Sequence, residues 1–346
     1  MPLATRAGPT PGRPARPPRG RRAPVPVVLH SAPLVLPVCV EPIRDGAVVV
    51  RGDRVLQVGA RADLLAYFPV TAEHRWPGMI VAGPVDARAA GAAGEPGVSA
   101  RATVARDLSD PAAPPGISYV EVRSAGEREW EERERDAVIT AIREAERPCV
   151  AGLSVRTRDP QVLEDVAVLA RTFGLRLLAD LDEHSPAALD EAGVLGPLCH
   201  VTCTRPLDPG ERKLLALRGA ALAVTPAQPV ADVLALLEEG NVVALGCLGR
   251  PGGPIGLAAE VRRRARELGL RQRGLDRRLV TAATLGGARA LGMDRGPGRI
   301  GTLGPGARAD FAVHDARGRY PYAALLAGPP CAGAVTGGEV TWGTPL

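Results

Sequence analysis

Residues 281–315, TAATLGGARALGMDRGPGRIGTLGPGARADFAVHD, contain the pattern that decides the fold. Small and apolar residues recur there at helical spacing. They are Ala282, Leu285, Ala288 and Leu291. Gly286 and Gly287 stand in the middle of the predicted helix, where each costs roughly 1 kcal/mol relative to alanine, so this helix is expected to pack closely against another element. The glycines and proline of 301–306 predict a turn, and 309–314 predicts a short strand.

Upstream of that stretch, predicted strands alternate with predicted helices. The strands are expected at 117–122, 149–155, 175–181, 198–204, 220–225 and 241–246. The helices are expected at 127–147, 160–173, 186–194, 209–218, 229–239, 256–269 and 276–292. Good N-caps support two of these helices, Asp159 before Pro160 and Ser185 before Pro186. This alternation predicts a parallel sheet with helices packed outside it.

The N-terminal part of the chain has a different composition. Residues 1–26 are rich in proline, glycine and arginine and have no apolar period, which predicts a disordered tail. The apolar residues of 25–40 predict the first strands of the fold. Residues 41–59 predict a hairpin that turns at Gly52–Asp53, and a short helix is expected at 61–68.

Three segments resemble a known family. The motifs ATLGGARALG (283–292) and GRIGTLGPGARADFAVHDA (298–316) resemble the C-terminal signature of the amidohydrolase superfamily. The segment DGAVVVRGDRVLQVG (45–59) is similar to the family's N-terminal β-domain. The branch with the greatest similarity is the aminodeoxyfutalosine deaminase and imidazolonepropionase group, alongside the chlorohydrolase-like deaminases. The resemblance implies an α/β fold, in which a TIM-like barrel adjoins a small β-domain formed by both termini.

The barrel is expected to be abbreviated. With an apolar strand at 79–85, the sequence contains about seven strand–helix units, whereas a complete barrel has eight. The last four strands match the family's order, so the shortfall is expected between residues 90 and 150. There, 91–115 is rich in glycine, alanine and proline and is expected to form a loop. The expected domains are a tail at 1–26, a composite β-domain at 27–78 and 296–346, and a barrel at 79–295.

The resemblance implies a set of metal ligands, which can be compared with this chain one by one. In the family, the first barrel strand ends in a His-x-His pair and the eighth strand carries an aspartate. In this chain Asp86 and Ala87 keep the frame of the first motif, but Arg88 and Ala90 stand at the two histidine positions. Leu248 stands at the position of the aspartate. Three ligand positions therefore hold residues that do not bind metals in this way.

The fifth and sixth strands keep more of the family pattern. Asp180 stands at the histidine of the fifth-strand His-x-x-Glu motif, and Glu183 matches the glutamate that serves proton transfer in the deaminases. His200 matches the sixth-strand histidine. A mononuclear zinc site needs about three protein ligands, and the fixed charge of Arg88 would repel a dication. We therefore expect no metal cofactor, with His200, Asp180 and His184 as weak candidate ligands.

Two other groups of residues could carry chemistry. The segment Cys199-His200-x-x-Cys203 resembles a metal-binding motif. On a strand, however, the two cysteines face one side and the histidine faces the other. We expect both thiols to be buried and to face outward. The six cysteines have no framework spacing and fit reduced thiols in a cytoplasmic protein. The glutamates and arginines of 127–135 predict an exposed helix face with local ion pairs.

Three functional hypotheses follow. The first is an amidohydrolase homologue that has lost the catalytic metal and acts in binding, regulation or complex formation. The alternative is an active deaminase or hydrolase of a nucleoside-like or cyclic amidine substrate, with zinc or iron in a site rearranged around Asp180, Glu183, His184 and His200. The third is a non-catalytic subunit that stabilises an active paralogue. The candidate partners are thus a small heterocyclic ligand, a second copy or a paralogue.

Charge and hydropathy bear on two further kinds of partner, nucleic acids and membranes. The net charge is +5, but the basic residues concentrate in residues 1–26, so nucleic-acid binding by the folded part is not expected. No stretch reaches the length of a membrane span, so a membrane partner is not expected.

Overall fold

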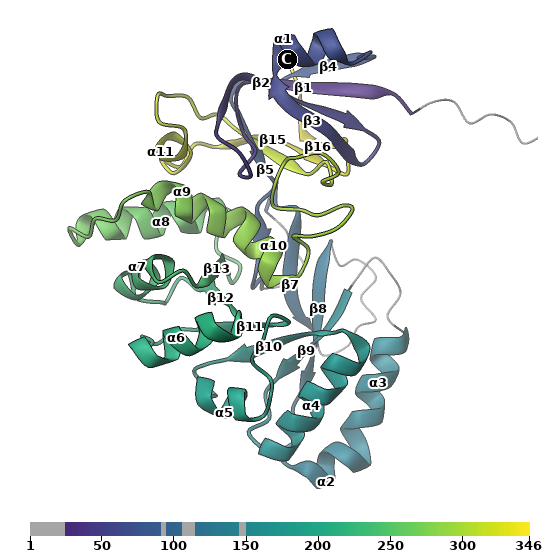
Figure 1. Ribbon diagram of the computed structural model, residues 1–346, viewed down its shortest axis with the longest axis vertical. Coiled ribbons are helices and arrows are strands. Elements are labelled where there is room, and N and C mark those ends of the chain that lie inside the picture. The colour runs from purple at the N-terminus through teal and green to yellow at the C-terminus, as the bar shows by residue number, and fades with distance from the viewer. Residues whose placement is uncertain (1–24, 91–94, 106–114, 145–149) are drawn as a thin grey trace, which may run out of the picture.

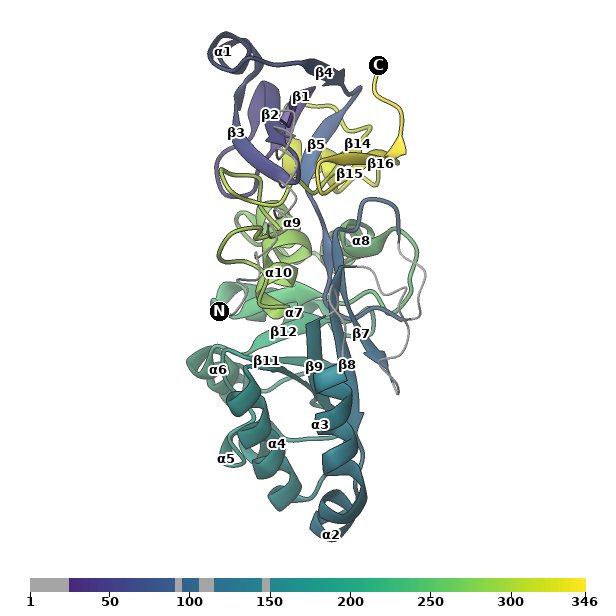
Figure 2. The same ribbon diagram turned by 90° about the vertical axis from the view of Figure 1, so that its right-hand side faces the viewer.

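The computed structural model describes residues 25–90, 95–105, 115–144 and 150–346. The predicted tail at 1–26 lies almost entirely outside these ranges. In Figure 1 and Figure 2, the N-terminal strands and the yellow C-terminal strands lie together at one end of the molecule, away from helices α2 to α5. Within the described ranges, no helix combines the length and the apolar character that crossing a membrane requires.

Sheet A joins the two ends of the chain. Its strand order is β16-β15-β14-β5-β1-β2-β3, and β4 pairs with β1 beside β5. The strands are β1 (Val27–Leu36), β2 (Ile43–Arg51), β3 (Arg54–Ala60), β4 (Ala72–Arg75), β5 (Met79–Ala82), β14 (Phe311–His314), β15 (Cys331–Thr336) and β16 (Glu339–Gly343). The predicted hairpin is present as β2 and β3, with a turn at Gly52. The short helix α1 (Arg61–Tyr67) packs beside β2 and β3, whereas α11 (Pro321–Leu325) contacts helix α9 (Leu275–Thr281).

Sheet B is an eight-stranded parallel sheet in the order β13-β12-β11-β10-β9-β8-β7-β6. Its strands are β6 (Val85–Asp86), β7 (Ala100–Ala105), β8 (Gly116–Val122), β9 (Val150–Val155), β10 (Arg176–Asp180), β11 (Cys199–Cys203), β12 (Ala221–Val224) and β13 (Val242–Leu245). The two edge strands meet, because the Ala87 amide donates to the Leu245 carbonyl at 2.8 Å and the Leu248 amide to that of Arg88 at 2.9 Å. The sheet therefore curls into a barrel, and the predicted α/β barrel with a small β-domain is confirmed.

The helices follow the later barrel strands. They are α2 (Glu127–Glu129), the π-helical turn η1 (Trp130–Glu134), α3 (Arg135–Glu144), α4 (Pro160–Phe173), α5 (Pro186–Glu191), α6 (Pro209–Arg218), α7 (Val230–Glu238), α8 (Gly253–Glu267), α9 (Leu275–Thr281), η2 (Ala282–Gly286) and α10 (Gly287–Ala290). The predicted N-caps are confirmed: Asp159 accepts from the amides of Gln161 and Val162, and Ser185 from that of Ala188.

Two predictions about the front of the barrel were wrong. The strand expected at 79–85 is divided, because Met79–Ala82 pairs with β1 and β14 in sheet A and only Val85–Asp86 enters the barrel. The segment 91–115, expected to be a loop, contains the strand Ala100–Ala105, so the barrel has eight strands and not about seven. The shortfall does lie there, but it concerns helices. Between Asp86 and Gly116 the described residues contain none.

The glycines of the deciding stretch are explained by close packing. A Cβ atom on Gly286 would lie 2.0 Å from the Val243 carbonyl oxygen, and one on Gly287 would lie 2.5 Å from that of Val85. Only glycine lets the helix approach β13 and β6 this closely. The helix η2–α10 therefore packs across the place where the barrel closes, as the mid-helix glycines predicted.

Two of the hydrophobic clusters among the described residues belong to the barrel. Alternate residues of the barrel strands pack outward against α4 to α9 in one large aliphatic cluster. The opposite faces, which point into the barrel, form a second cluster dominated by alanines and closed by Ala288, Ala290 and Leu291. Small side chains thus line most of this part of the barrel interior, which leaves room for the few large side chains that point into it.

Candidate functional site

The side chains of Tyr119 and His200 lie inside the barrel. The Tyr119 hydroxyl lies 2.9 Å from Nδ1 of His200, and both side chains are fully buried. A Cβ atom on Gly152 would lie 2.6 Å from the Tyr119 ring, so this glycine makes space for the ring to reach across from β8. The sixth-strand histidine is therefore held by a phenol within the barrel.

His200 is neutral in this setting. Burial, together with the nearby guanidinium groups of Arg176 and Arg88, lowers the pKa of His200 to about 3. Burial also raises the pKa of Tyr119, so the phenol keeps its proton. The Nε2 atom of His200 makes no hydrogen bond of good geometry to the described residues. This pair can offer a hydrogen bond inside the barrel, but it carries no charge near pH 7.

Arg88, which the sequence resemblance aligns with the first histidine of the family motif, brings a cation to the barrel mouth. Burial lowers the pKa of Arg88, as does the charge of Arg156, while the carboxylates of Asp180, Glu121 and Asp86 oppose the change. A guanidinium nevertheless stays charged in proteins. A Cβ atom on Gly246 would lie 2.6 Å from the Cβ atom of Arg88, so glycine at 246 is what admits this side chain.

Acidic side chains at the ends of β8 and β10 act on this cation. Glu121 on β8 and Glu183 after β10 both pair with Arg156, which follows β9; the Nε atom of Arg156 lies 3.4 Å from Glu121. Asp180 accepts from the Asp182 amide at 3.0 Å. Burial raises the pKa of Asp180, and the carboxylates of Asp182 and Glu183 add to this effect. The mouth is therefore a network of alternating charges in which Glu183 is bound to an arginine.

His184 lies close to these residues but faces away from the barrel axis. Its Nε2 atom is 2.6 Å from the Thr157 carbonyl oxygen and its Nδ1 atom is 3.1 Å from that of Asp180. Both ring nitrogens are thus engaged with backbone carbonyls, and the ring joins the loops after β9 and β10. The structure does not bring His184 together with His200.

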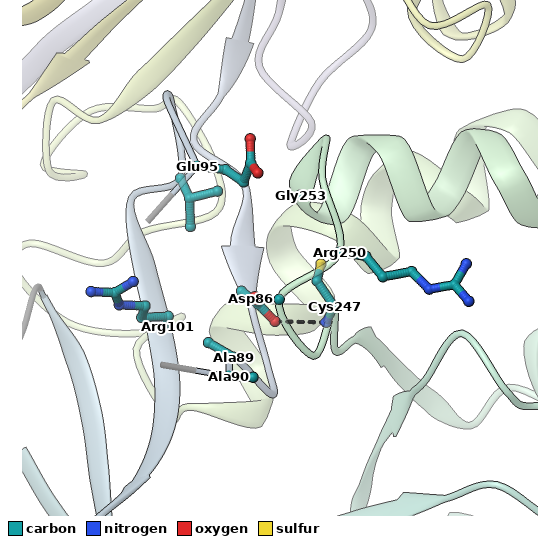
Figure 3. A pocket seen from close by; sticks show the side chains of 10 residues that line it. Asp86, Ala89, Ala90, Glu95, Arg101, Cys247, Arg250 and Gly253 are labelled. Carbon is teal, nitrogen blue, oxygen red and sulfur yellow. Dashed lines mark hydrogen bonds between the residues drawn. The ribbon is translucent and has the colours of Figure 1, made fainter. Parts of the chain in front are cut away.

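The other two replaced positions lie at the seam between β6 and β13. Leu248 has a left-handed backbone (φ 51°) and its side chain is 42% exposed. Its amide takes part in closing the barrel. Asp86, at the end of β6, accepts a hydrogen bond from the Cys247 amide at 2.9 Å (Figure 3). It also accepts one from the Arg88 amide at 3.1 Å. Burial raises the pKa of Asp86, and these two hydrogen bonds oppose that change.

A cavity of about 150 Å³ opens beside this seam, and Figure 3 shows its lining. Its walls include Ala90 and the charged side chains of Asp86, Glu95, Arg101 and Arg250. The position that holds the second family histidine is thus part of a small polar cavity with side chains of both charges.

Cys199 and Cys203 are fully buried in the outward-facing cluster, whereas His200 points into the barrel. The geometry expected from strand alternation is confirmed. Burial raises the pKa of both thiols to about 12. They are therefore protonated near pH 7 and unsuited to nucleophilic attack. The predicted exposed helix face is also confirmed, with an ion pair between Arg128 and Glu132.

The residues at the mouth do not fit a catalytic metal. In the described part of the chain, no group of three or more histidine, cysteine, aspartate and glutamate side chains is placed to hold a metal ion. Glu183 is paired with Arg156, both nitrogens of His184 face carbonyls, and Arg88 contributes positive charge. The donor set thus lacks the three ligands that a zinc site requires, and no step through a metal can be derived from it.

Sequence reasoning missed several residues of this site. Tyr119, Glu121 and Arg156 were not singled out, although each lies on a predicted strand or directly after one. The alternation of side chains along a strand could have pointed to Tyr119 and Glu121, because the two share a face of β8. No sequence pattern could have predicted the pairing of Arg156 with Glu183, since it joins residues from neighbouring strands.

The barrel and the attached sheet A define a fold of the TIM-barrel class. Several solved deaminases and hydrolases share this fold. The chain is similar to an adenosine deaminase from Xanthomonas campestris with bound zinc, with a TM-score of 0.74, 16% identity and coverage of 93% of this chain and 94% of that one. For the guanine deaminase of E. coli the TM-score is 0.74, the identity 13% and the coverage 93% and 100%.

Two further comparisons agree with the family branch. The aminofutalosine deaminase of Helicobacter pylori has a TM-score of 0.72 at 14% identity and covers 91% of this chain and 100% of its own. A stretch of 109 residues is 38% identical to the imidazolonepropionase of Saccharopolyspora erythraea and covers 29% of this chain and 28% of that protein. The match thus spans little more than a quarter of that relative. No family model matches the chain.

Proposed function

We propose that this protein is an amidohydrolase-fold homologue that has lost metal-dependent hydrolysis and acts by binding, in regulation or in complex formation. One observation carries the proposal: the guanidinium of Arg88 enters the barrel mouth at a family ligand position, among the carboxylates of Asp180 and Glu121. A guanidinium has no lone pair to give to a metal, and its charge does not titrate away.

The charges around Arg88 balance one another without a metal ion. In a hydrolase of this family, a dication would balance the acidic side chains that surround it. Here Arg88 and Arg156 supply that balance through Glu121, Asp180 and Glu183. A buried carboxylate without such a partner is costly. The two arginines therefore stabilise a barrel mouth that needs no ion.

The fitting occupant of this site is a small polar molecule. The cavity beside Asp86 presents acidic and basic groups within about 150 Å³, which suits a compact ligand with donors and acceptors on opposite edges. Small heterocycles of the kind implied by the family have this chemistry. A second copy of the chain or an active paralogue remains the proposed macromolecular partner, and co-purification from native extract tests it.

Metal analysis of the purified chain tests the proposal. We expect less than about 0.1 zinc, iron or manganese per chain after purification without chelators. About one tightly bound metal per chain would refute the loss of the metal site. Ammonia release from a panel of nucleosides and cyclic amidines, if abolished by Glu183→Ala, would support the alternative of an active deaminase instead.

A restored variant serves as the matched control. Arg88→His, Ala90→His, Asp180→His and Leu248→Asp together return the ligands that the family resemblance implies, with His200 already in place. We expect this variant to retain about one zinc per chain, because tight zinc binding needs three or more such ligands. If neither protein retains zinc but both are folded, the scaffold and not the ligand set prevents binding, and the assigned ligand positions are wrong.

A further inference from the structure

A second cavity lies between helices α8 and α9, which pack side by side (Figure 1). It has a volume of about 590 Å³, which is in the range of small-molecule sites. Its walls come from the last turns of α8, the loop at 269–274 and the first turn of α9. The cavity shares no lining residue with the smaller cavity beside Asp86.

Arginine is concentrated around this cavity. Residues 261–278 contain eight arginines and only two acids, Glu267 and Asp276, whereas the whole chain has 43 basic and 38 acidic residues. Four of these arginines pair with carboxylates, and Arg278 donates to the Leu237 carbonyl. The four pairs are Arg262–Asp276, Arg263–Glu267, Arg264–Glu260 and Arg277–Glu41.

The other three arginines, Arg266, Arg271 and Arg273, have no such partner. Their side chains are exposed and form no ion pair or hydrogen bond with the described residues. Arg266 and Arg271 line the cavity. The only acid in its walls is Asp276, whose two oxygens accept from Arg262 at 2.7 and 3.1 Å. The cavity therefore presents two accessible guanidinium groups whose charge no neighbouring carboxylate balances.

The backbone that carries these two arginines is held in place. Beside Arg271, Nε2 of Gln272 donates to the Leu234 carbonyl of α7 at 3.0 Å, which fastens the loop to a third helix. The ion pair of Arg262 with Asp276 joins α8 to α9 on the other side of the loop. Both arginines thus project from a frame that is formed before a ligand binds, which reduces the entropy lost on binding.

The two guanidinium groups favour a phosphate over a carboxylate. Each guanidinium is a planar fork that can bind two oxygens of an anion. A phosphate group carries close to two charges at pH 7 and has three acceptor oxygens, enough for two forks, whereas one fork already occupies both oxygens of a carboxylate. The partly buried Leu270 and Leu275 add an apolar part to the wall, against which an organic group can pack.

We propose that this cavity binds a small phosphate ester, with its phosphate group between Arg266 and Arg271 and its organic part against Leu270 and Leu275. The contacting groups of both arginines are exposed, so the ligand reaches them without a change in the fold. The site lies apart from the barrel mouth and does not depend on the proposed function.

Titration of the full chain with phenyl phosphate tests the proposal. Isothermal titration calorimetry is expected to give a Kd below about 1 mM, and Arg266→Gln and Arg271→Gln are each expected to bind about tenfold more weakly. Arg263→Gln is the matched control, because Arg263 is an exposed arginine of α8 that does not line the cavity. It should keep the wild-type affinity within about twofold. Equal weakening in Arg263→Gln and Arg271→Gln would show that net charge alone attracts the anion, and would overturn the site.

Two further anions test the ligand class. Benzoate has the same ring but one charge, and is expected to bind at least about tenfold more weakly than phenyl phosphate. Inorganic phosphate lacks the organic part and should bind at least about threefold more weakly. Benzoate binding as tightly as phenyl phosphate overturns the preference for phosphate, and inorganic phosphate binding as tightly overturns the assignment to an ester. No heat at several millimolar phenyl phosphate refutes the proposal as a whole.

Modification of arginine by phenylglyoxal gives an independent measurement. Phenyl phosphate is expected to slow the reaction of Arg271 at least threefold, as read by mass spectrometry of the digested chain. Arg295, whose side chain is 92% exposed and does not line the cavity, serves as the internal control and keeps its rate. Equal protection of Arg271 and Arg295, or protection of neither, contradicts binding in the cavity.

Discussion

The two halves of the barrel are built in different ways. From β9 to β13 the strands pair in continuous parallel register, and helices follow each strand. From β6 to β8 the first strand has only two residues, and the described residues between Asp86 and Gly116 contain no helix. Each strand of the back half is therefore covered by the helix that follows it, whereas the described residues between β6 and β8 supply no such helix.

The seam between β6 and β13 illustrates what this difference means. The Asp86 carboxylate accepts from the amides of Arg88 and Cys247, two residues on opposite sides of the closing seam. Two backbone hydrogen bonds and helix η2–α10 also hold this seam. Asp86 adds the side-chain link between the two edge strands, so a substitution there is expected to have a larger effect than one in the back half.

The largest expected effect is therefore at Asp86. Replacement of Asp86 with alanine leaves two buried amides without acceptors, each worth about 1–3 kcal/mol, so the free energy of unfolding should fall by about 3 kcal/mol. Urea denaturation measures this. Asp86→Asn keeps an acceptor oxygen and should lose less than half as much. Equal losses in both variants would show that the charge, and not the acceptor, holds the seam.

The next effect concerns the space for Arg88. Gly246→Ala places a Cβ atom 2.6 Å from that of Arg88, and such overpacking typically costs about 1–3 kcal/mol. We expect a loss of about 2 kcal/mol in unfolding free energy. The double variant with Arg88→Gly should recover most of that loss, because the clashing atom is gone. If the double-mutant cycle shows no coupling energy between positions 88 and 246, the close contact between them is contradicted.

A substitution in the back half gives the reference for the comparison. Asp159 caps helix α4 by accepting from Gln161 and Val162. Asp159→Ala should cost about 1 kcal/mol, as other N-caps do, and Asp159→Ser should cost only a few tenths. Thermal unfolding followed by circular dichroism measures both. A cost above that of Asp86→Ala would reverse the proposed contrast between the halves.

The smallest effect is expected at Leu248. Its left-handed backbone suits asparagine better than leucine, by about 1 kcal/mol. Because part of the leucine side chain is buried, Leu248→Asn should stabilise the protein by only about 0.5 kcal/mol. The midpoint of urea denaturation should rise slightly. A fall of more than about 1 kcal/mol would mean that the leucine packing outweighs the backbone strain.

The success of the sequence predictions follows the same division. Helix periods, N-caps and apolar strand runs placed the back half within one or two residues at most ends, because each signal lies within the element that it predicts. The strand Ala100–Ala105 was missed, since a run of small residues next to a glycine-rich loop has no strand pattern of its own. Its pairing with Gly116–Val122 defines it as a strand.

The predictions about the candidate site divide in the same way, between local patterns and contacts across strands. Strand alternation correctly separated Cys199 and Cys203 from His200, because side-chain direction along a strand is local. The partners of His200 and Glu183 could not be predicted. Tyr119 reaches His200 from another strand over Gly152, and Arg156 reaches Glu183 across a loop.

The sequence by itself determined the fold class, the order of the later barrel units and the glycines of the closing helix. These depend on spacing and residue type along the chain. The tertiary structure alone decided how Asp86 links the two edge strands and how Arg88 comes to lie near Asp180 and Glu121. Such features depend on distances between segments far apart in sequence, which no local pattern encodes.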